Sequence, residues 1–207
     1  MTTQEQFYGE MLPRLEAARH QLLDTIGQYP PPGQERENPH PIQYCSSRIK
    51  SAESMTRKLK RRGLPPDRDS ALNKVNDALG IRIVCSFADD VYGAAGWLED
   101  RPEFQVLQVK DYIAYPKENG YRSYHMILKI LEGPGNGMKA EIQIRTIALD
   151  FWASLEHRMK YKKEIAHEKL IREELKRCAD EIASVDLSMQ TIRDLLRDQV
   201  PPHETLR

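Results

Sequence analysis

The stretch KAEIQIRT, residues 139–146, constrains the fold of this 207-residue chain more than any other segment. Polar and apolar side chains alternate along it, which predicts a β-strand with two different faces. Its three aliphatic residues share one face, which is expected to pack on a core. The opposite face carries Glu141, Gln143 and Arg145. An acid, an amide and a base in a row either face solvent or line a site.

Other segments predict a sheet around this strand, with helices packed on it. Strands rich in β-branched or alternating residues are predicted at 80–87, 104–113, 124–131 and 138–146. Amphipathic helices are predicted at 4–27, 48–62, 89–100 and 148–163. Ser47 is the expected N-cap of the second helix and Gly63 its end. The proline-rich segment 29–41 is expected to be a linker or surface loop, and 64–77 mostly loop. This order of elements favours an α+β fold with a mixed sheet.

Composition excludes several classes of protein. The 31 Lys and Arg residues balance the 31 Asp and Glu residues, so net charge indicates no particular partner. Cys45, Cys85 and Cys178 are far apart and form no CxxC pair, which argues against a zinc site or a disulfide framework. Reduced thiols fit a cytoplasmic protein. The N-terminus has no signal-peptide pattern and no apolar run approaches the ~18 residues of a membrane span, so we expect no contact with a membrane.

A heptad pattern runs through the C-terminal part of the chain. Apolar residues alternate at spacings of four and three, at Ile171, Leu175, Cys178, Ile182, Val185, Met189, Ile192 and Leu196. Such a helix either packs on the core of its own domain or forms a contact between copies of the chain. The length and narrowness of the seam favour the second interpretation.

A basic segment lies between residues 48 and 62. It contains Arg48, Lys50, Arg57, Lys58, Lys60, Arg61 and Arg62. Charges of one sign at helical spacing repel each other, and a bound polyanion would relieve that repulsion. A solvated basic face is an equally good explanation. Because no GxxxxGK[ST] loop is present, a phosphate site here would be built from side chains.

Two acids and one loop are further candidates for a site. Asp77 precedes a predicted strand and Glu141 lies within one, so the two carboxylates together would suit Mg²⁺, although any fold contains many acids. The loop at 115–125 carries Lys117, Tyr121 and His125. An aromatic ring beside cations suits a nucleotide, whose base stacks on the ring while its phosphates meet the cations. The alternative is an ordinary surface loop with one aromatic anchor.

Four stretches resemble the successive motifs of the RelA/SpoT-type alarmone synthetase domain. They are SRIKSAESMTRKL, DALGIRIV, VKDYIAYPKENGYRSYHM and EIQIRTIALDFWASLEHRMKYK, in the order of the family. The short chain is similar to the stand-alone small alarmone synthetases. The resemblance implies an N-terminal helix and linker at 1–43, a nucleotidyltransferase-like synthetase domain at 44–163 and an oligomerisation helix at 164–207.

The resemblance also implies an activity and a set of residues for it. Enzymes of this family transfer pyrophosphate from ATP to the ribose 3′-hydroxyl of GDP or GTP and release AMP. By motif position, ATP is expected to contact Arg48, Lys50, Ser54, Lys58, Arg82 and Gln143. The guanine nucleotide is expected to contact Lys117, Tyr121, His125, Asp150 and Glu156. Asp77 and Glu141 are expected to hold Mg²⁺, with Glu141 also the base for the 3′-hydroxyl. Small synthetases of this type form homotetramers.

Some expectations stay open at this point. Leu79 and Tyr124 stand where the family often has Ala and Leu, which leaves the pocket shape and the acceptor preference open. A toxic relative that pyrophosphorylates the 3′ end of tRNA, or that makes adenosine alarmones, would share the same motifs. An RNA-binding or scaffold protein without catalysis is a third function, and the basic residues 57–62 would guide RNA in either case.

Overall fold

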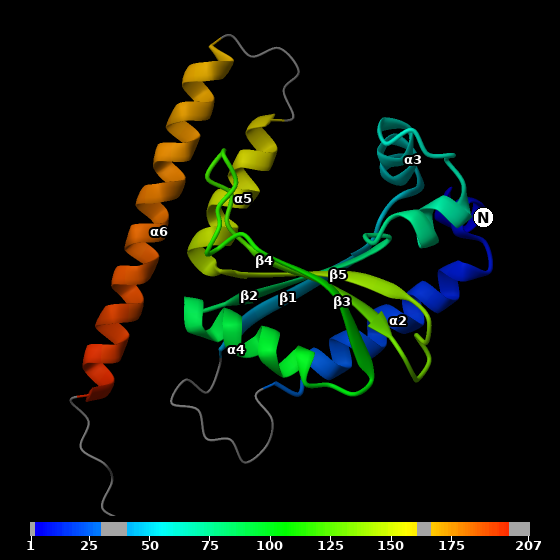
Figure 1. Cartoon of the computed structure of the whole chain (residues 1–207), viewed down its shortest axis with the longest axis horizontal. Coiled ribbons are helices and arrows are strands. Elements are labelled where there is room, and N and C mark those ends of the chain that lie inside the picture. The colour runs from blue at the N-terminus through cyan, green and yellow to red at the C-terminus, as the bar shows by residue number, and fades with distance from the viewer. Residues whose placement is uncertain (1–2, 30–40, 161–166, 199–207) are drawn as a thin grey trace, which may run out of the picture.

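A five-stranded mixed sheet organises the chain in this computed structural model, which describes residues 3–29, 41–160 and 167–198 (Figure 1). The strands are β1 (Ile42–Ile49), β2 (Leu79–Cys85), β3 (Phe104–Asp111), β4 (Tyr124–Ile130) and β5 (Lys139–Thr146). Their order is β1-β2-β5-β4-β3; β2 and β5 are parallel and the other neighbours antiparallel. The predicted α+β fold with a mixed sheet and flanking helices is confirmed.

Helices flank both faces of this sheet. They are α1 (Thr3–Tyr8), α2 (Met11–Ile26), α3 (Ala52–Arg61), the π-helical turn η1 (Ser70–Lys74), α4 (Ala88–Glu99), α5 (Ile147–Lys160) and α6 (Glu168–Asp198). In Figure 1, α2 and α4 lie below the sheet, α3 and α5 rise above opposite ends of it, and α6 runs alongside α5. No helix in the described ranges combines the length and the apolar character that crossing a membrane requires.

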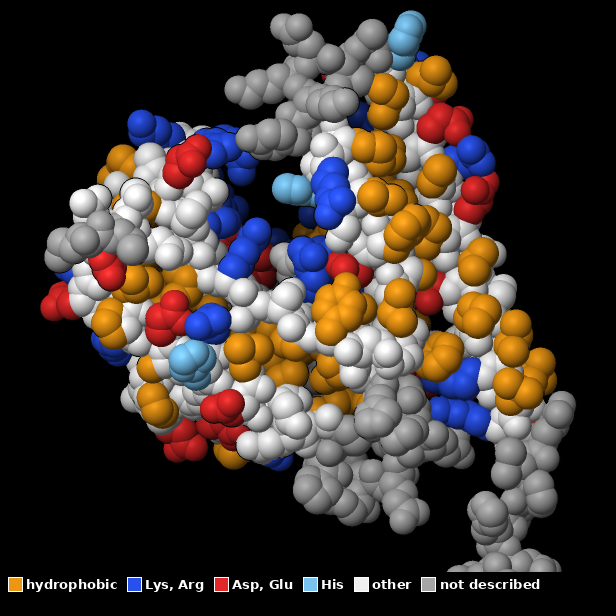
Figure 2. Space-filling view, turned by 180° about the vertical axis from the view of Figure 1, so that it is seen from behind, with side chains coloured by type: hydrophobic (Ala, Val, Ile, Leu, Met, Phe, Trp, Pro, Cys, Tyr) orange, Lys and Arg blue, Asp and Glu red, His pale blue; other side chains and the backbone are white. Residues whose placement is uncertain are grey.

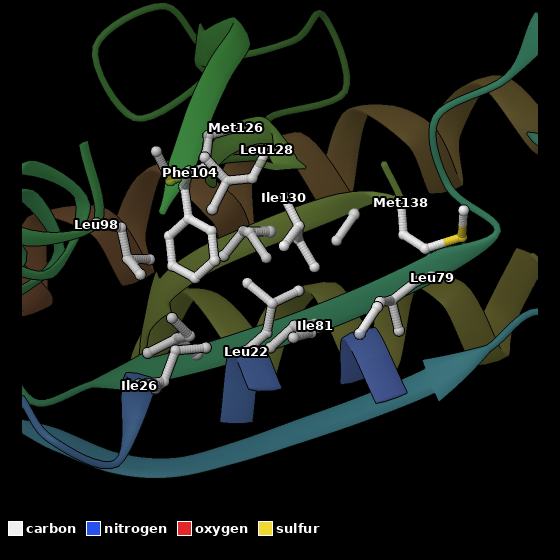
Figure 3. Packing of buried hydrophobic residues seen from close by; sticks show 14 of the residues in the cluster. Leu22, Ile26, Leu79, Ile81, Leu98, Phe104, Met126, Leu128, Ile130 and Met138 are labelled. Atoms are coloured by element: carbon white, nitrogen blue, oxygen red, sulfur yellow. The ribbon is translucent and has the colours of Figure 1, made fainter. Parts of the chain in front are cut away.

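The hydrophobic core lies between the sheet and the α2–α4 layer (Figure 3). Leu22 and Ile26 of α2 meet Leu98 of α4 and the inward residues of β2, β4 and β5, such as Ile81 and Leu128. The aliphatic face of KAEIQIRT belongs to this core, because its three aliphatic side chains are fully buried. The opposite face of the same strand therefore looks away from α2 and α4, into the space between α3 and α5.

The N-terminal helix differs from the prediction of one helix over 4–27. It is divided into α1 and α2 at Gly9, whose φ of +55° lies in the left-handed region that glycine adopts without strain. The break lets Tyr8 turn inward, where it is fully buried and donates a hydrogen bond to the carbonyl oxygen of Lys50 at 2.8 Å.

The predicted helix over 48–62 with Ser47 as its N-cap was wrong at its start. Residues 42–49 form β1, and α3 begins at Ala52 with Ser51 as its N-cap, whose Oγ accepts from the Ser54 amide at 3.3 Å. The true N-cap lies four residues after the predicted one. Pairing with β2 favours a strand here, because it satisfies the backbone hydrogen bonds of residues 42–49. The predicted end is confirmed, since Gly63 has a φ of +69° just after α3.

The remaining elements follow their predictions closely. The hairpin of β4 and β5 is present, as are the strand at β3 and the short helix α4. Segment 64–77 is mostly irregular, apart from η1. Most of the proline-rich segment, residues 30–40, and the predicted helical residues 161–163 lie outside the described residues.

The C-terminal heptad seam divides into two halves. Leu175, Cys178 and Ile182 pack with Trp152 of α5, as expected for a helix docked on its own domain. The second half is exposed, with Val185 60%, Met189 52%, Ile192 50% and Leu196 61% accessible. Hydrophobic side chains are visible along this face of α6 in Figure 2. The first half of the seam therefore packs on its own domain, while a contact between copies of the chain stays a prediction for the exposed second half.

Candidate active site

The polar face of the sheet forms the floor of a cleft between α3 and α5. Strand register aligns one outward-facing residue from each strand in a row across this floor: Ser46, Arg82, Gln143, His125 and Lys110. The next row includes Arg48, Gly80, Glu141 and Ile127. Figure 2 shows the molecule hollowed here, with Lys and Arg side chains gathered around the hollow.

One cavity in the cleft, of about 300 Å³, lies over β1, β2 and β5. Its lining includes six residues that the sequence motifs predicted together: Arg48, Lys50, Asp77, Arg82, Glu141 and Gln143. They come from three strands, from the residue after β1 and from the segment just before β2. The structure therefore brings the two predicted metal carboxylates to one cavity, although 64 positions separate them in the chain.

Asp77 is held between two lysines. Its Oδ2 pairs with the ammonium group of Lys50, which follows β1, and with that of Lys58 on α3 at 2.5 Å. Burial by itself would raise the pKa of Asp77, but the two lysine hydrogen bonds outweigh it and hold that pKa below its usual range. The carboxyl group is therefore ionised, and it fixes both ammonium groups at the edge of the cavity.

Glu141 is the second ionised carboxylate of the cleft. Its Oε2 accepts from the side-chain amide of Gln143 at 3.1 Å, and its Oε1 lies 3.7 Å from Nδ1 of His125. Burial would raise the pKa of Glu141, but the nearby His125 and the hydrogen bond from Gln143 lower it overall. Burial lowers the pKa of His125 despite the nearby carboxylate, which favours a neutral imidazole. Glu141 is therefore able to accept a proton at neutral pH.

A divalent metal fits the two carboxylates. Asp77 Oδ1 is buried and has no hydrogen-bond partner among the described residues, so this oxygen is available as a ligand. The described ranges contain no group of three or more His, Cys, Asp or Glu residues that could enclose a metal. Mg²⁺ suits such a sparse site, because it keeps several waters and takes further ligands from substrate phosphates.

A second cavity, of about 200 Å³, lies over β3 and β4 beside the loop that precedes β4. It is lined by Gln108, Lys110, Tyr112, Lys117, His125, Ile127 and Glu141. Glu141 thus lines both cavities and stands between them. The two cavities share the carboxylate that is best placed to accept a proton from a bound group.

The loop between β3 and β4 presents Lys117 to the second cavity and places Tyr121 beside Lys117. The Lys117 ammonium lies 4.5 Å from the ring centroid of Tyr112 and 4.8 Å from that of Tyr121. The Tyr121 hydroxyl is 2.8 Å from Nε2 of His125. Three of the predicted acceptor residues are therefore brought together by the folded loop and β4.

Two other predicted acceptor residues lie on α5, and both are buried. Glu156 is 8% exposed and accepts from Asn119 at 3.0 Å, so it holds the loop before β4. Asp150 is 6% exposed and accepts from Tyr44 at 2.6 Å, and it pairs with Arg82 and Arg145. Asp150 and Glu156 therefore bind other side chains of the protein, and these contacts help to position the walls of the cleft.

Ser54, Leu79 and Tyr124 lie outside the lining of the two cavities. Ser54 lies in the first turn of α3, one turn before Lys58 and on the same helix face, but it does not line the first cavity. Leu79 and Tyr124, the two departures from the family pattern, do not line the cleft. Leu79 is fully buried in the core and Tyr124 packs against the core, on the face of the sheet away from the cleft.

Several residues of the cleft were missed as site residues, among them Arg145, Tyr112 and Asn119. Arg145 is a hub of hydrogen bonds, Tyr112 supports Lys117, and Asn119 ties the loop to Glu156. The alternation of KAEIQIRT placed Arg145 on the polar face and was a usable signal. Asn119 stands in a loop, where no periodicity indicates a direction, and Tyr112 lies just beyond the end of β3, although the predicted strand extended to residue 113.

Comparison with known proteins agrees with this geometry. Residues 47–166 match the family model described as a region found in RelA / SpoT proteins. The chain is 41% identical over 157 residues to the GTP pyrophosphokinase YwaC of Bacillus subtilis, covering 74% of this chain and 75% of the relative. It is 35% identical over 163 residues to the GTP pyrophosphokinase YjbM of the same organism, covering 77% of this chain and 76% of the relative.

Solved structures agree as well. The crystal structure of small alarmone synthetase 2 from Bacillus subtilis superposes with a TM-score of 0.76 at 37% identity, covering 90% of this chain and 98% of the other. That of small alarmone synthetase 1 from the same organism, bound to its product pppGpp, gives 0.73 at 29% identity, covering 90% and 96%. Both the family model and the sequence identity span most of the cleft, and the chain belongs to the RelA/SpoT family.

Proposed function

We propose that this chain synthesises the alarmones ppGpp and pppGpp, as a GTP diphosphokinase. It transfers the pyrophosphoryl group of ATP to the 3′-hydroxyl of GDP or GTP and releases AMP. The observation that carries the proposal is the position of Glu141, which lines both cavities of the cleft and is ionised. Relatives named GTP pyrophosphokinase and a similar structure with bound pppGpp support the same reaction.

The first cavity is the proposed ATP site. Arg48 and Arg82 present guanidinium groups from neighbouring strands, a geometry that suits the two faces of an adenine ring. Lys50 and Lys58 stand at its edge, where their charges offset those of the transferred phosphates. Ser54 and Gln143 complete the residues that we assign to ATP.

The second cavity is the proposed guanine nucleotide site. Tyr121 offers a ring on which guanine stacks, and Lys117 and His125 face the phosphates. Asp150 and Glu156 act by holding the walls of this site. The acceptor 3′-oxygen then lies near Glu141, between the two nucleotides.

Proton transfer to Glu141 is the proposed chemical contribution of the protein. Glu141 removes the proton of the 3′-hydroxyl while that oxygen forms a bond to the β-phosphorus of ATP. The bond from the β-phosphorus to the oxygen bridging it to the α-phosphorus breaks, and that oxygen leaves with AMP. Bound Mg²⁺, for which Asp77 and Glu141 are the proposed protein ligands, would supply charge neutralisation at the phosphates.

Product analysis of the purified chain tests this function. The chain is incubated with ATP, Mg²⁺ and, separately, GDP, GTP, ADP or tRNA, and the products are resolved by anion-exchange chromatography. We expect AMP together with ppGpp or pppGpp in the guanine nucleotide reactions. Labelled phosphate appearing only on tRNA or on adenosine nucleotides would contradict the proposal and favour the toxic relatives, for which the exposed basic residues of α3 would guide RNA.

Assembly and location belong to the same proposal. We infer a cytoplasmic homotetramer in which the exposed second half of the α6 seam contacts another copy. Exposed apolar residues of α6 and of α5, among them Phe151 at 59%, form the surface that such a contact would bury.

A further inference from the structure

Arg145 is a charged residue of β5 that is only 4% exposed. Its guanidinium donates to four side-chain oxygens: Ser123 Oγ at 3.2 Å, Asp150 Oδ1 at 3.0 Å, Gln143 Oε1 at 2.9 Å and Tyr121 Oη at 2.5 Å. An arginine has five N–H donors in a rigid planar fork, so protein atoms satisfy most of them. The Arg145 side chain therefore makes its contacts with the protein side chains around it.

The bond to Tyr121 is the first link of a chain of contacts that reaches Glu141. Because Arg145 can only donate, the Tyr121 oxygen accepts from it, and the same hydroxyl lies 2.8 Å from Nε2 of His125. The other ring nitrogen of His125, Nδ1, lies 3.7 Å from Oε1 of Glu141.

The bond to Gln143 orients a donor toward the same carboxylate. Arg145 donates to the amide oxygen of Gln143, so the amide nitrogen is turned the other way and donates to Oε2 of Glu141 at 3.1 Å. Both oxygens of Glu141 therefore face groups whose orientation depends on one buried arginine.

A third bond reaches the proposed ATP side of the cleft. Asp150 Oδ1 accepts from Arg145 and lies 3.2 Å from the guanidinium of Arg82, which lines the first cavity. Asp150 Oδ2 accepts from Tyr44 at 2.6 Å. Arg82 is thus tied through one carboxylate to the same hub as Tyr121.

We propose that Arg145 is a positioning residue for the transfer reaction. It orients Tyr121 and Gln143, and through them the surroundings of Glu141, and it links this acceptor side to Arg82 on the ATP side. The inference rests on the proposed synthetase function. A buried ion pair that merely stabilised the fold would affect unfolding but would not make the kinetic effects of Arg145 and the Tyr121 hydroxyl depend on each other.

A double-mutant cycle tests this role. Arg145→Lys keeps the charge but loses the planar fork, and Tyr121→Phe keeps the ring but removes the hydroxyl. We expect each change alone to lower kcat/KM for the guanine nucleotide about 10-fold or more, as for lost hydrogen bonds to charged groups. The double variant is expected to be little worse than the poorer single one, because both changes break one chain of contacts.

The KM for ATP gives a second readout. Arg145→Lys is expected to raise KM for ATP as well, whereas Tyr121→Phe is expected to leave it unchanged, because only Arg145 is linked to Arg82 through Asp150. Arg19→Lys, a matched change in a partly exposed arginine of α2 that pairs with Glu16, is the control and should behave as the unmodified chain.

Several results would overturn the proposal. Losses of kcat/KM that multiply in the double variant would show independent roles. Full kcat/KM in Tyr121→Phe would also contradict it, and this arm decides the question if Arg145→Lys does not fold by circular dichroism. Assay of the unmodified chain separates the test of the synthetase function from the test of Arg145. If the unmodified chain makes no alarmone, the synthetase function itself is contradicted. If it is active but the effects of the two substitutions are independent, only the role of Arg145 is contradicted.

Discussion

Asp77 and Glu141 show how neighbours set the chemistry of two similar side chains. Both are largely buried carboxylates whose pKa is lowered overall, Asp77 by two ammonium groups and Glu141 by an imidazole and an amide. The face of the sheet on which the Glu141 side chain lies could be predicted from alternation along its strand. The pairing of Asp77 with Lys50 could not, because it depends on where β1 ends, and residues 42–49 had not been recognised as a strand.

The proposed role of Asp77 in metal binding gives a prediction at this scale. In Asp77→Asn the side chain loses its charge and one carboxylate ligand, so we expect the Mg²⁺ concentration for half-maximal rate to rise roughly tenfold or more. Calorimetric titration of Mn²⁺ in the presence of a non-hydrolysable ATP analogue should show the same weakening. Asp100→Asn, at an exposed position after α4, is the control. Unchanged metal affinity in Asp77→Asn would remove Asp77 from the site.

At the scale of elements, the loop before β4 and helix α6 depend on each other. Arg122 donates to the carbonyl oxygens of Gly120 and Ala179 and pairs with Asp180 at 3.0 Å. Gly120 has a φ of +84°, and a Cβ there would lie 2.6 Å from the Cβ of Ala179. The sequence predicted a loop at this glycine and a helix at 171–196, but not their contact, since nothing local encodes which segments meet across more than fifty residues.

Gly120→Ala is predicted to disturb this contact. Its methyl group would collide with α6 in addition to the backbone strain, so the loop that carries Tyr121 must shift and KM for the guanine nucleotide should rise. Gly63→Ala is the matched control, because its φ of +69° carries a similar strain of about 1 kcal/mol but no atom lies within 4 Å of the added Cβ. Urea unfolding should show a larger loss of unfolding free energy for Gly120→Ala than for Gly63→Ala. Equal losses, with equal KM values, would contradict the contact.

The whole molecule presents one conspicuous apolar surface along α6 and α5. A seam of eight positions was readable from the sequence, but its division between the domain and the exterior was not. The division depends on where α5 and α6 diverge, which is a property of the folded chain. Trp152, whose indole N–H donates to the Leu175 carbonyl at 2.9 Å, holds the first half of α6 in place and leaves the second half exposed.

Assembly through this surface is a prediction about the whole molecule. Light scattering should give a mass four times the 24.0 kDa of the chain. Replacing both Met189 and Ile192 by Glu puts charges into the seam and is expected to reduce that mass, while Ser188→Glu, at an exposed polar position of α6, should not. A concentration-independent mass of one chain for the unmodified protein would contradict assembly.

The proposed position of Glu141 between two nucleotide sites is tested most directly by Glu141→Gln, which keeps the size of the side chain and removes its charge. The measurement is the rate of AMP and alarmone formation, together with binding of a non-hydrolysable ATP analogue and of GDP. We predict that synthesis falls by at least about 1,000-fold while the melting temperature is kept and the guanine nucleotide still binds. Product formation at the rate of the unmodified chain would contradict the account.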